Sequence, residues 1–299
     1  MFVSIRRAVA GAAMTLAPIT APAQSSLPDA IYYQLPGMAN VTVTSNVTYR
    51  HVGESGRDVP LTMDVYRPPA MRPGQRFPAL IFVHGGLTLD QPRTAKDWGI
   101  YQSWGRVAAA SGLVGVTFNH RMTTNDNVDV ASGDVRAAID LVRRNAAEWN
   151  VDPDRLCLAF YSAGGPLSSV PLRERAPYVK CVVLYYPFLD LEHLRTQTQF
   201  RPAYSSAHVD SLSDYSPANV IQRNPATVPP IFLAMAGRDA IPRLNESIER
   251  FLAAAVRAHL TIDFYLHPVG EHGFDRRNRD ARTRSIIEAT LAFVHRHVD

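Results

Sequence analysis

The chain has 299 residues, of which 46% are hydrophobic and 19% are charged, with 22 prolines and 17 glycines. This composition is typical of a globular protein and argues against collagen-like, coiled-coil and disordered classes. Its 31 basic and 27 acidic side chains give a formal net charge of only +4, so the charge balance does not indicate a nucleic-acid partner.

The first 23 residues have the pattern of a secretory signal peptide. Arg6 and Arg7 form a basic start, residues 8–17 form a short apolar run, and residues 21–23 read Ala-Pro-Ala, a small-residue cleavage site. The apolar run is shorter than the roughly 20 residues that a membrane-spanning helix needs. We therefore expect cleavage near Ala23 and a secreted or periplasmic protein without stable membrane insertion. A membrane anchor or a disordered N-terminus is the alternative.

Strand-like patterns recur from about residue 40 onwards. Residues 41–52 and 61–66 alternate in polarity, which favours antiparallel edge strands. Four nearly continuous apolar runs follow, as in strands that are buried on both faces of a sheet, and two further runs come after them. These six runs are residues 79–83, 113–118, 156–160, 181–185, 230–236 and 261–266.

Helical candidates alternate with these strands. Residues 99–110, 135–149, 245–258 and 283–298 carry apolar positions at helical spacing. Such alternation predicts an α/β fold, with a mostly parallel sheet and helices on both faces. No repeat or interdomain linker is visible, so we expect a single domain over residues 24–299.

One stretch, residues 188–227, interrupts this alternation. It holds no strong strand pattern and is rich in Ser, Asp, Tyr and Pro. It is either a surface excursion with one or two short helices or a lid over the carboxyl ends of the strands, where open α/β sheets bind ligands. Its aromatic residues either pack this segment onto the core or line a pocket.

Cys157 and Cys181 are the only cysteines. Both fall in runs predicted as central strands, where a free cysteine behaves as a small buried hydrophobe. We therefore favour two buried thiols, with a single disulfide as the alternative in an oxidising compartment. Neither cysteine belongs to a CxxC or Cys/His cluster, and no His/Asp cluster has the spacing of metal ligands, so the sequence predicts no metal site.

Ser162 is the candidate nucleophile. It follows an apolar strand and begins the small-residue turn Ser-Ala-Gly-Gly, after which a short helix can start at Pro166. A serine on a sharp strand-to-helix turn has its Oγ lifted clear of the sheet and close to backbone N–H groups at a helix start. The alternative is a glycine-rich turn without chemistry.

A second loop offers groups that stabilise negative charge. His84-Gly85-Gly86 follows the strand at residues 79–83 and presents backbone N–H groups at the carboxyl end of that strand. Such donors can stabilise the oxyanion that forms when a serine attacks an acyl carbon. His84 itself is expected to shape this loop.

Asp239 and His272 complete the predicted catalytic group, because each follows a predicted strand at its carboxyl end. His272 would take the proton from Ser162, and Asp239 would orient the imidazole and stabilise its charged form. His267 is the second choice of base. The rival acids are Glu271, Asp190 and Glu192.

With these motifs, residues 40–299 resemble the α/β-hydrolase family, close to its esterase/lipase branch with an HGG oxyanion loop. The chain order Ser162, Asp239, His272 matches that family. The resemblance implies an eight-stranded, mostly parallel sheet, a Ser-His-Asp triad without cofactor, and oxyanion donors at Ala163 and at Gly85 or Gly86. One departure is that Phe160 replaces the first glycine of the usual G-x-S-x-G turn.

The predicted function is therefore hydrolysis of carboxylic esters through an acyl-enzyme on Ser162, acting on a small-molecule or polymer-borne ester. Two alternatives remain open. One is a serine hydrolase of acylated polysaccharide, lactone or peptide bonds. The other is a catalytically silent hydrolase fold used for binding, which only Phe160 favours. The sequence does not indicate an oligomeric state.

Overall fold

The structure is a computed structural model that describes residues 29–54, 56–72, 74–86, 94–122, 127–195 and 212–299. The predicted signal peptide, residues 1–23, lies outside the described residues. So do residues 196–211 of the predicted lid, which include two of its aromatic residues, Phe200 and Tyr204.

The framework is one eight-stranded sheet with the strand order β1-β2-β4-β3-β5-β6-β7-β8. The two β1–β2 and β2–β4 pairs are antiparallel, and the other five pairs are parallel. This arrangement confirms the mostly parallel sheet and the antiparallel first strands. The strands are β1 (Thr42–Glu54), β2 (Arg57–Arg67), β3 (Phe77–Val83), β4 (Val114–Phe118), β5 (Val151–Tyr161), β6 (Val179–Tyr185), β7 (Ile231–Ala236) and β8 (Ile262–His267).

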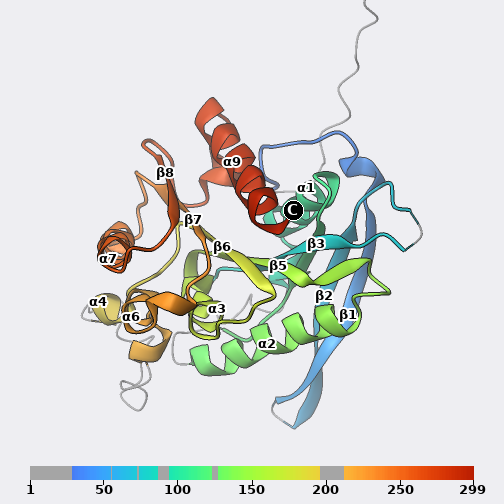
Figure 1. The fold of residues 1–299 in the computed structure, drawn as a ribbon, viewed down its shortest axis with the longest axis horizontal. Helices are drawn as coiled ribbons and strands as arrows, with labels where there is room; N and C mark the ends of the chain where they lie inside the picture. Colours follow the sequence, from blue (N-terminus) through green and yellow to red (C-terminus); the bar gives the residue numbers. More distant parts are fainter. Residues whose placement is uncertain (1–28, 55, 73, 87–93, 123–126, 196–211) are drawn as a thin grey trace, which may run out of the picture.

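Helices cover both faces of this sheet. In Figure 1, α1 (Gly99–Ala110) and α9 (Ala281–Val298) lie on one face, whereas α2 (Val128–Arg144) and α3 (Ser169–Arg173) lie on the other. The helix α7 (Leu244–Arg257) packs against β7, and the short α8 (Phe274–Arg277) precedes α9. Because helices shield both faces, every residue of β4 and β7 is buried, as the continuous apolar runs predicted.

The helix α2 differs from the predicted range, 135–149. It begins seven residues earlier, at Val128, and ends at Arg144. The reason is that the buried stripe continues backwards through Ala131 to Val128, so the first turns also gain from packing on the sheet. The other three predicted helices lie within two residues of α1, α7 and α9.

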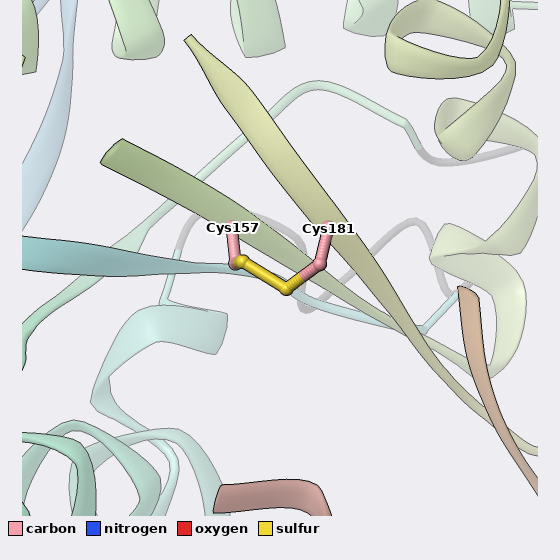
Figure 2. The surroundings of a disulfide bond; sticks show 2 residues. All are labelled: Cys157 and Cys181. Carbon is pink, nitrogen blue, oxygen red and sulfur yellow. A yellow bond between two sulfur atoms is a disulfide. The ribbon is translucent and has the colours of Figure 1, made fainter. Parts of the chain in front are cut away.

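The prediction of two free thiols is wrong, because Cys157 and Cys181 form a disulfide (Figure 2). The parallel register of β5 and β6 places Cys157 directly opposite Cys181, and their Cα atoms are 4.8 Å apart. That separation lies within the range that a disulfide spans. Both cysteines are fully buried, so the bond crosses between two central strands inside the core.

The described part of the interrupting segment contains the short helices α4 (Leu191–Arg195) and α6 (Pro217–Arg223) and the 3₁₀ turns Ser213–Tyr215 and Pro225–Thr227. The helix α6 packs against α7 and α3. Phe188 at the start of the segment is buried in the main core, so this ring packs rather than lining a pocket. Within the described residues, no helix combines the length and the apolar character needed to cross a membrane.

Candidate active site

Ser162 stands on a strained turn at the carboxyl end of β5. Its φ is +48°, a backbone conformation that a residue with a side chain adopts only at a cost. A 3₁₀ turn over Ser162–Ser168 begins at this residue, and its hydroxyl lines a cavity above the sheet edge. The strain therefore lifts the serine out of the strand and into reach of a ligand.

Two glycines after Ser162 let other loops approach this turn. A Cβ on Gly164 would overlap the carbonyl of His84, and a Cβ on Gly165 would overlap the backbone of Phe188. The space beside these two glycines is thus filled by the protein's own backbone. Phe188 N–H also donates to the Ser162 carbonyl at 3.0 Å, which fixes the turn from the other side.

Phe160 does not block the nucleophile. Its ring is fully buried in the hydrophobic core, and its backbone keeps the β5 register opposite Val83 and Leu184. Ser162, two residues later, remains half-buried and faces the cavity. The core thus accommodates the bulk that replaces the usual glycine.

The structure brings Ser162, His272 and Asp239 together at the carboxyl edge of the sheet. The hydroxyl oxygen of Ser162 lies 2.8 Å from His272 Nε2, and His272 Nδ1 lies 2.6 Å from Asp239 Oδ2. The Asp239 side chain is fully buried, whereas 24% of His272 is exposed. With Nδ1–H donating to the carboxylate, Nε2 is free to accept the serine proton.

Of the four rival residues, two have other partners and two are exposed. His267 is buried and contacts Asp280 and Thr283. Asp190 accepts hydrogen bonds from Arg250 and from the backbone N–H of His193. The two rival glutamates, Glu192 and Glu271, are exposed.

The HGG loop leaves one of the two glycine N–H groups that were expected as alternative oxyanion donors. Gly85 and Gly86 both line the cavity with Ser162, but the Gly85 N–H donates to the Tyr101 hydroxyl at 2.7 Å. Gly85 therefore has no free N–H for an oxyanion. Gly86, whose φ of +105° suits only glycine, and Ala163, at the start of the 3₁₀ turn where N–H groups lack helical partners, remain as candidate donors.

A pair of histidines holds this loop from behind. The rings of His84 and His120 are stacked, and the Nε2 of His120 donates to the His84 carbonyl at 3.0 Å. In turn, the backbone N–H of His120 donates to His84 Nε2 at 3.2 Å. Burial lowers the pKa of both rings, to about 4 for His120 and well below the usual value for His84. Two neutral imidazoles thus fix the strand end that carries Gly85 and Gly86.

The cavity has a volume of about 420 Å³. Its walls near Ser162 are the aromatic rings of Trp98, Tyr101 and Tyr186, and its rim holds an ion pair between Arg276 and Asp29 at 3.0 Å. Sequence analysis did not find these three rings. Tyr186 was the most accessible of them to such reasoning, because it directly follows the β6 strand at its carboxyl end.

A second buried carboxylate, also missed, supports the site. Asp275 accepts hydrogen bonds from the Trp104 indole N–H and the Tyr186 hydroxyl, each at 2.8 Å. Burial raises the pKa of Asp275. The ring of Tyr186 lies 4.7 Å from the ring of His272. Asp275 therefore fixes one wall of the cavity against the imidazole of His272.

No group of three or more His, Cys, Asp or Glu side chains among the described residues is arranged to hold a metal ion. The arrangement that the structure does provide is a hydroxyl, an imidazole and a buried carboxylate in sequence beside a cavity. This arrangement can activate a serine for attack on an acyl carbon.

Comparison with known proteins finds a matching family model and relatives that are esterases. The sequence model of the BD-FAE family matches residues 63–249. The chain is 27% identical over 272 residues to esterase LipQ of Mycobacterium tuberculosis. This alignment covers 84% of the present chain and 62% of LipQ. It is 26% identical to an acetylxylan esterase of Xylanibacter ruminicola, over 54% of this chain and 35% of that protein. It thus spans less than two thirds of either relative.

Solved structures share the fold. A structure from a study of two fungal esterases of Rhizomucor miehei superimposes with a TM-score of 0.68 at 21% identity, covering 86% of this chain and 84% of the other. Esterase 2 of Thermogutta terrifontis with bound propionate gives 0.66 at 22% identity, covering 87% and 96%. The architecture is that of the α/β hydrolases.

Proposed function

The chain belongs to the BD-FAE family of α/β hydrolases, and on this premise we propose that it hydrolyses carboxylic esters through an acyl-enzyme on Ser162. The observation that carries the proposal is the continuous contact from the Ser162 hydroxyl through His272 to the buried Asp239, at 2.8 Å and 2.6 Å. The esterase names of the relatives support the same reaction class.

The proposed reaction has two halves. Ser162 Oγ attacks the ester carbonyl while His272 Nε2 takes the serine proton, and Asp239 stabilises the imidazolium that forms. The carbonyl oxygen becomes an oxyanion beside the Gly86 and Ala163 N–H groups. Collapse expels the alcohol, which leaves with the proton from His272. Water then repeats these steps on the acyl-enzyme and releases the acid.

An acylated polysaccharide is a second candidate substrate. The similarity to the acetylxylan esterase of Xylanibacter ruminicola and the aromatic walls of the cavity support it, since flat apolar rings pack well against sugar and aryl rings. Export of the chain, which we propose on its signal-peptide pattern in residues 1–23, would bring the enzyme to polymers that cannot enter a cell.

The test compares the wild type with a Ser162→Ala variant. The wild type should cleave p-nitrophenyl esters and react with a fluorophosphonate probe, whereas Ser162→Ala should lose several orders of magnitude in turnover and all labelling. Ser111→Ala, at the C-terminal end of α1, is the matched control and should behave as wild type. Acetylated and feruloylated xylan assayed beside the small esters would test the polysaccharide candidate.

Two outcomes would reject the proposal. Retention of most ester cleavage by Ser162→Ala would exclude this serine as the nucleophile. A folded wild type that neither cleaves esters nor reacts with the probe would favour the silent, binding alternative.

A further inference from the structure

The hydrogen bond between Gly85 and Tyr101 puts a hydroxyl where a backbone N–H was expected to face the reacting carbonyl. The Gly85 N–H donates to the Tyr101 hydroxyl at 2.7 Å. We propose that the Tyr101 hydroxyl is itself an oxyanion donor, together with Gly86 and Ala163. This inference rests on the proposed ester hydrolysis and adds a catalytic side chain to it.

The position of Tyr101 suits this role. It is the third residue of α1, only 4% exposed, and it lines the cavity with Ser162, Gly85 and Gly86. The backbone of Gly85 is so close to the nucleophile that a Cβ on this glycine would lie 2.8 Å from Ser162 Cβ. A hydroxyl that is hydrogen-bonded to the Gly85 N–H therefore stands next to the reacting centre.

The ring of Tyr101 is held rigidly, so its hydroxyl is placed before substrate arrives. It packs edge-on against Tyr161 at 5.5 Å and 85°, and the rings of His84 and Trp98 lie 6.1 and 6.2 Å away. Preorganised donors of this kind need no reorganisation during the reaction. This packing thus holds the O–H dipole of Tyr101 in a fixed position at the cavity wall.

The O–H of Tyr101 remains available as a hydrogen-bond donor. A tyrosine hydroxyl has a single O–H and can also accept, and here it accepts from Gly85. Among the residues that the structure describes, no acceptor is found for the Tyr101 proton. Accepting one hydrogen bond strengthens the next that a group donates. Burial also raises the pKa of Tyr101, so the hydroxyl keeps its proton at neutral pH.

The step requires no proton transfer from tyrosine. As Ser162 Oγ forms a bond to the acyl carbon, the carbonyl π electrons move to oxygen, and the Tyr101 O–H donates a hydrogen bond to that oxygen. When the alcohol leaves, the electrons return to form the carbonyl and the hydrogen bond weakens. Tyr101 keeps its proton throughout, and His272 carries the proton from serine to the alcohol.

The test is a Tyr101→Phe variant, which removes one oxygen and leaves the ring packing in place. We expect kcat for p-nitrophenyl acetate to fall by about 100-fold, the lower end of the loss seen for one oxyanion donor, with KM changed less than about threefold because the ground-state carbonyl gains little from this donor. A trifluoromethyl ketone that forms an oxyanion adduct with serine should bind about 100-fold more weakly, by the same argument.

Tyr185→Phe is the matched control, because the Tyr185 hydroxyl contacts Thr290 in the core and does not line the cavity. Equal losses in kcat and in melting temperature for both variants would mean a structural role and would overturn the inference. So would a Tyr101→Phe variant within threefold of wild type, since the freed Gly85 N–H would then suffice. Neither result touches the nucleophile, which Ser162→Ala tests separately. A wild type without any ester hydrolysis would overturn both proposals.

Discussion

The imidazole rings of His84 and His120 are stacked with their centroids 3.6 Å apart and their planes inclined by 4°. Each ring uses one nitrogen as donor and the other as acceptor. His84 Nδ1 donates to the Gly85 carbonyl, and His120 Nδ1 accepts from the Met122 N–H. Both rings must therefore be neutral for the HGG loop to keep its shape. Protonation would place two positive charges face to face in the core.

This pair predicts how stability depends on pH. Both histidines titrate near pH 6.5 in the unfolded chain, but the pKa of His120 in the folded protein is about 4 and that of His84 is also lowered. Between pH 6.5 and 4 the unfolded state binds more protons, so the free energy of unfolding should fall as the pH falls, by up to about 1.4 kcal/mol per pH unit for each histidine. Above pH 6.5 this contribution is complete and constant.

Urea denaturation at a series of pH values measures the slope. His120→Asn should be less stable at pH 7 but should show a shallower fall towards pH 4, because one titrating group is gone. His259→Asn, at an exposed position, is the control for the loss of a histidine outside the core. An identical slope in His120→Asn and wild type would contradict the neutral pair.

The role of Asp239 predicts a large effect on turnover. Asp239→Asn should leave the fold intact and lower kcat by about 10⁴-fold, because an amide favours the wrong imidazole tautomer and cannot stabilise its charged form. Steady-state ester hydrolysis with circular dichroism checks both statements. Glu271→Gln removes the exposed carboxylate next to His272 and should stay within about twofold of wild type. The reverse result would move the acid to Glu271.

The close approach of two loops predicts that Gly85 tolerates no side chain. A Cβ there would lie 2.7 Å from the Tyr161 carbonyl and 2.8 Å from Ser162 Cβ. Gly85→Ala should therefore lower kcat/KM by at least about tenfold through a small displacement of the serine and destabilise the fold by about 1–3 kcal/mol through overpacking.

Gly53 is the matched control, because nothing lies within 4 Å of a Cβ there. Gly53→Ala should change neither activity nor the urea midpoint appreciably. If Gly85→Ala also changed neither activity nor the urea midpoint, the loop could shift enough to admit a methyl group, and the prediction would be wrong.

The disulfide predicts a separate loss of stability. Cys157 and Cys181 are 24 residues apart in the chain, so a Cys157→Ala, Cys181→Ala double variant should lose about 3 kcal/mol of unfolding free energy, mainly by freeing the unfolded chain. Because neither cysteine lines the cavity, kcat should change little at 25 °C. Wild type unfolded with and without a reductant provides the comparison, and equal urea midpoints with and without the reductant would count against the bond.

Most of the framework follows from local pattern. Continuous apolar runs predicted β3 to β7, because strands shielded on both faces need apolar residues at every position. The Ser-Ala-Gly-Gly turn pointed to Ser162 for a local reason too, since few sequences allow a strained turn between a strand and a helix. The start of α2 was less accessible, because the packing that extends it to Val128 comes from the sheet.

Periodicity and strand ends are properties of neighbouring residues, so they predicted the α/β class, the candidate edge of the sheet and the chain order Ser162, Asp239, His272. Three contacts became visible only in the folded chain: the bond between Cys157 and Cys181, the hydrogen bond from the Gly85 N–H to Tyr101, and the hydrogen bond by which Asp275 holds Tyr186 beside His272. These contacts join residues 16 to 89 positions apart, and they depend on strand register and side-chain packing, which no local pattern encodes.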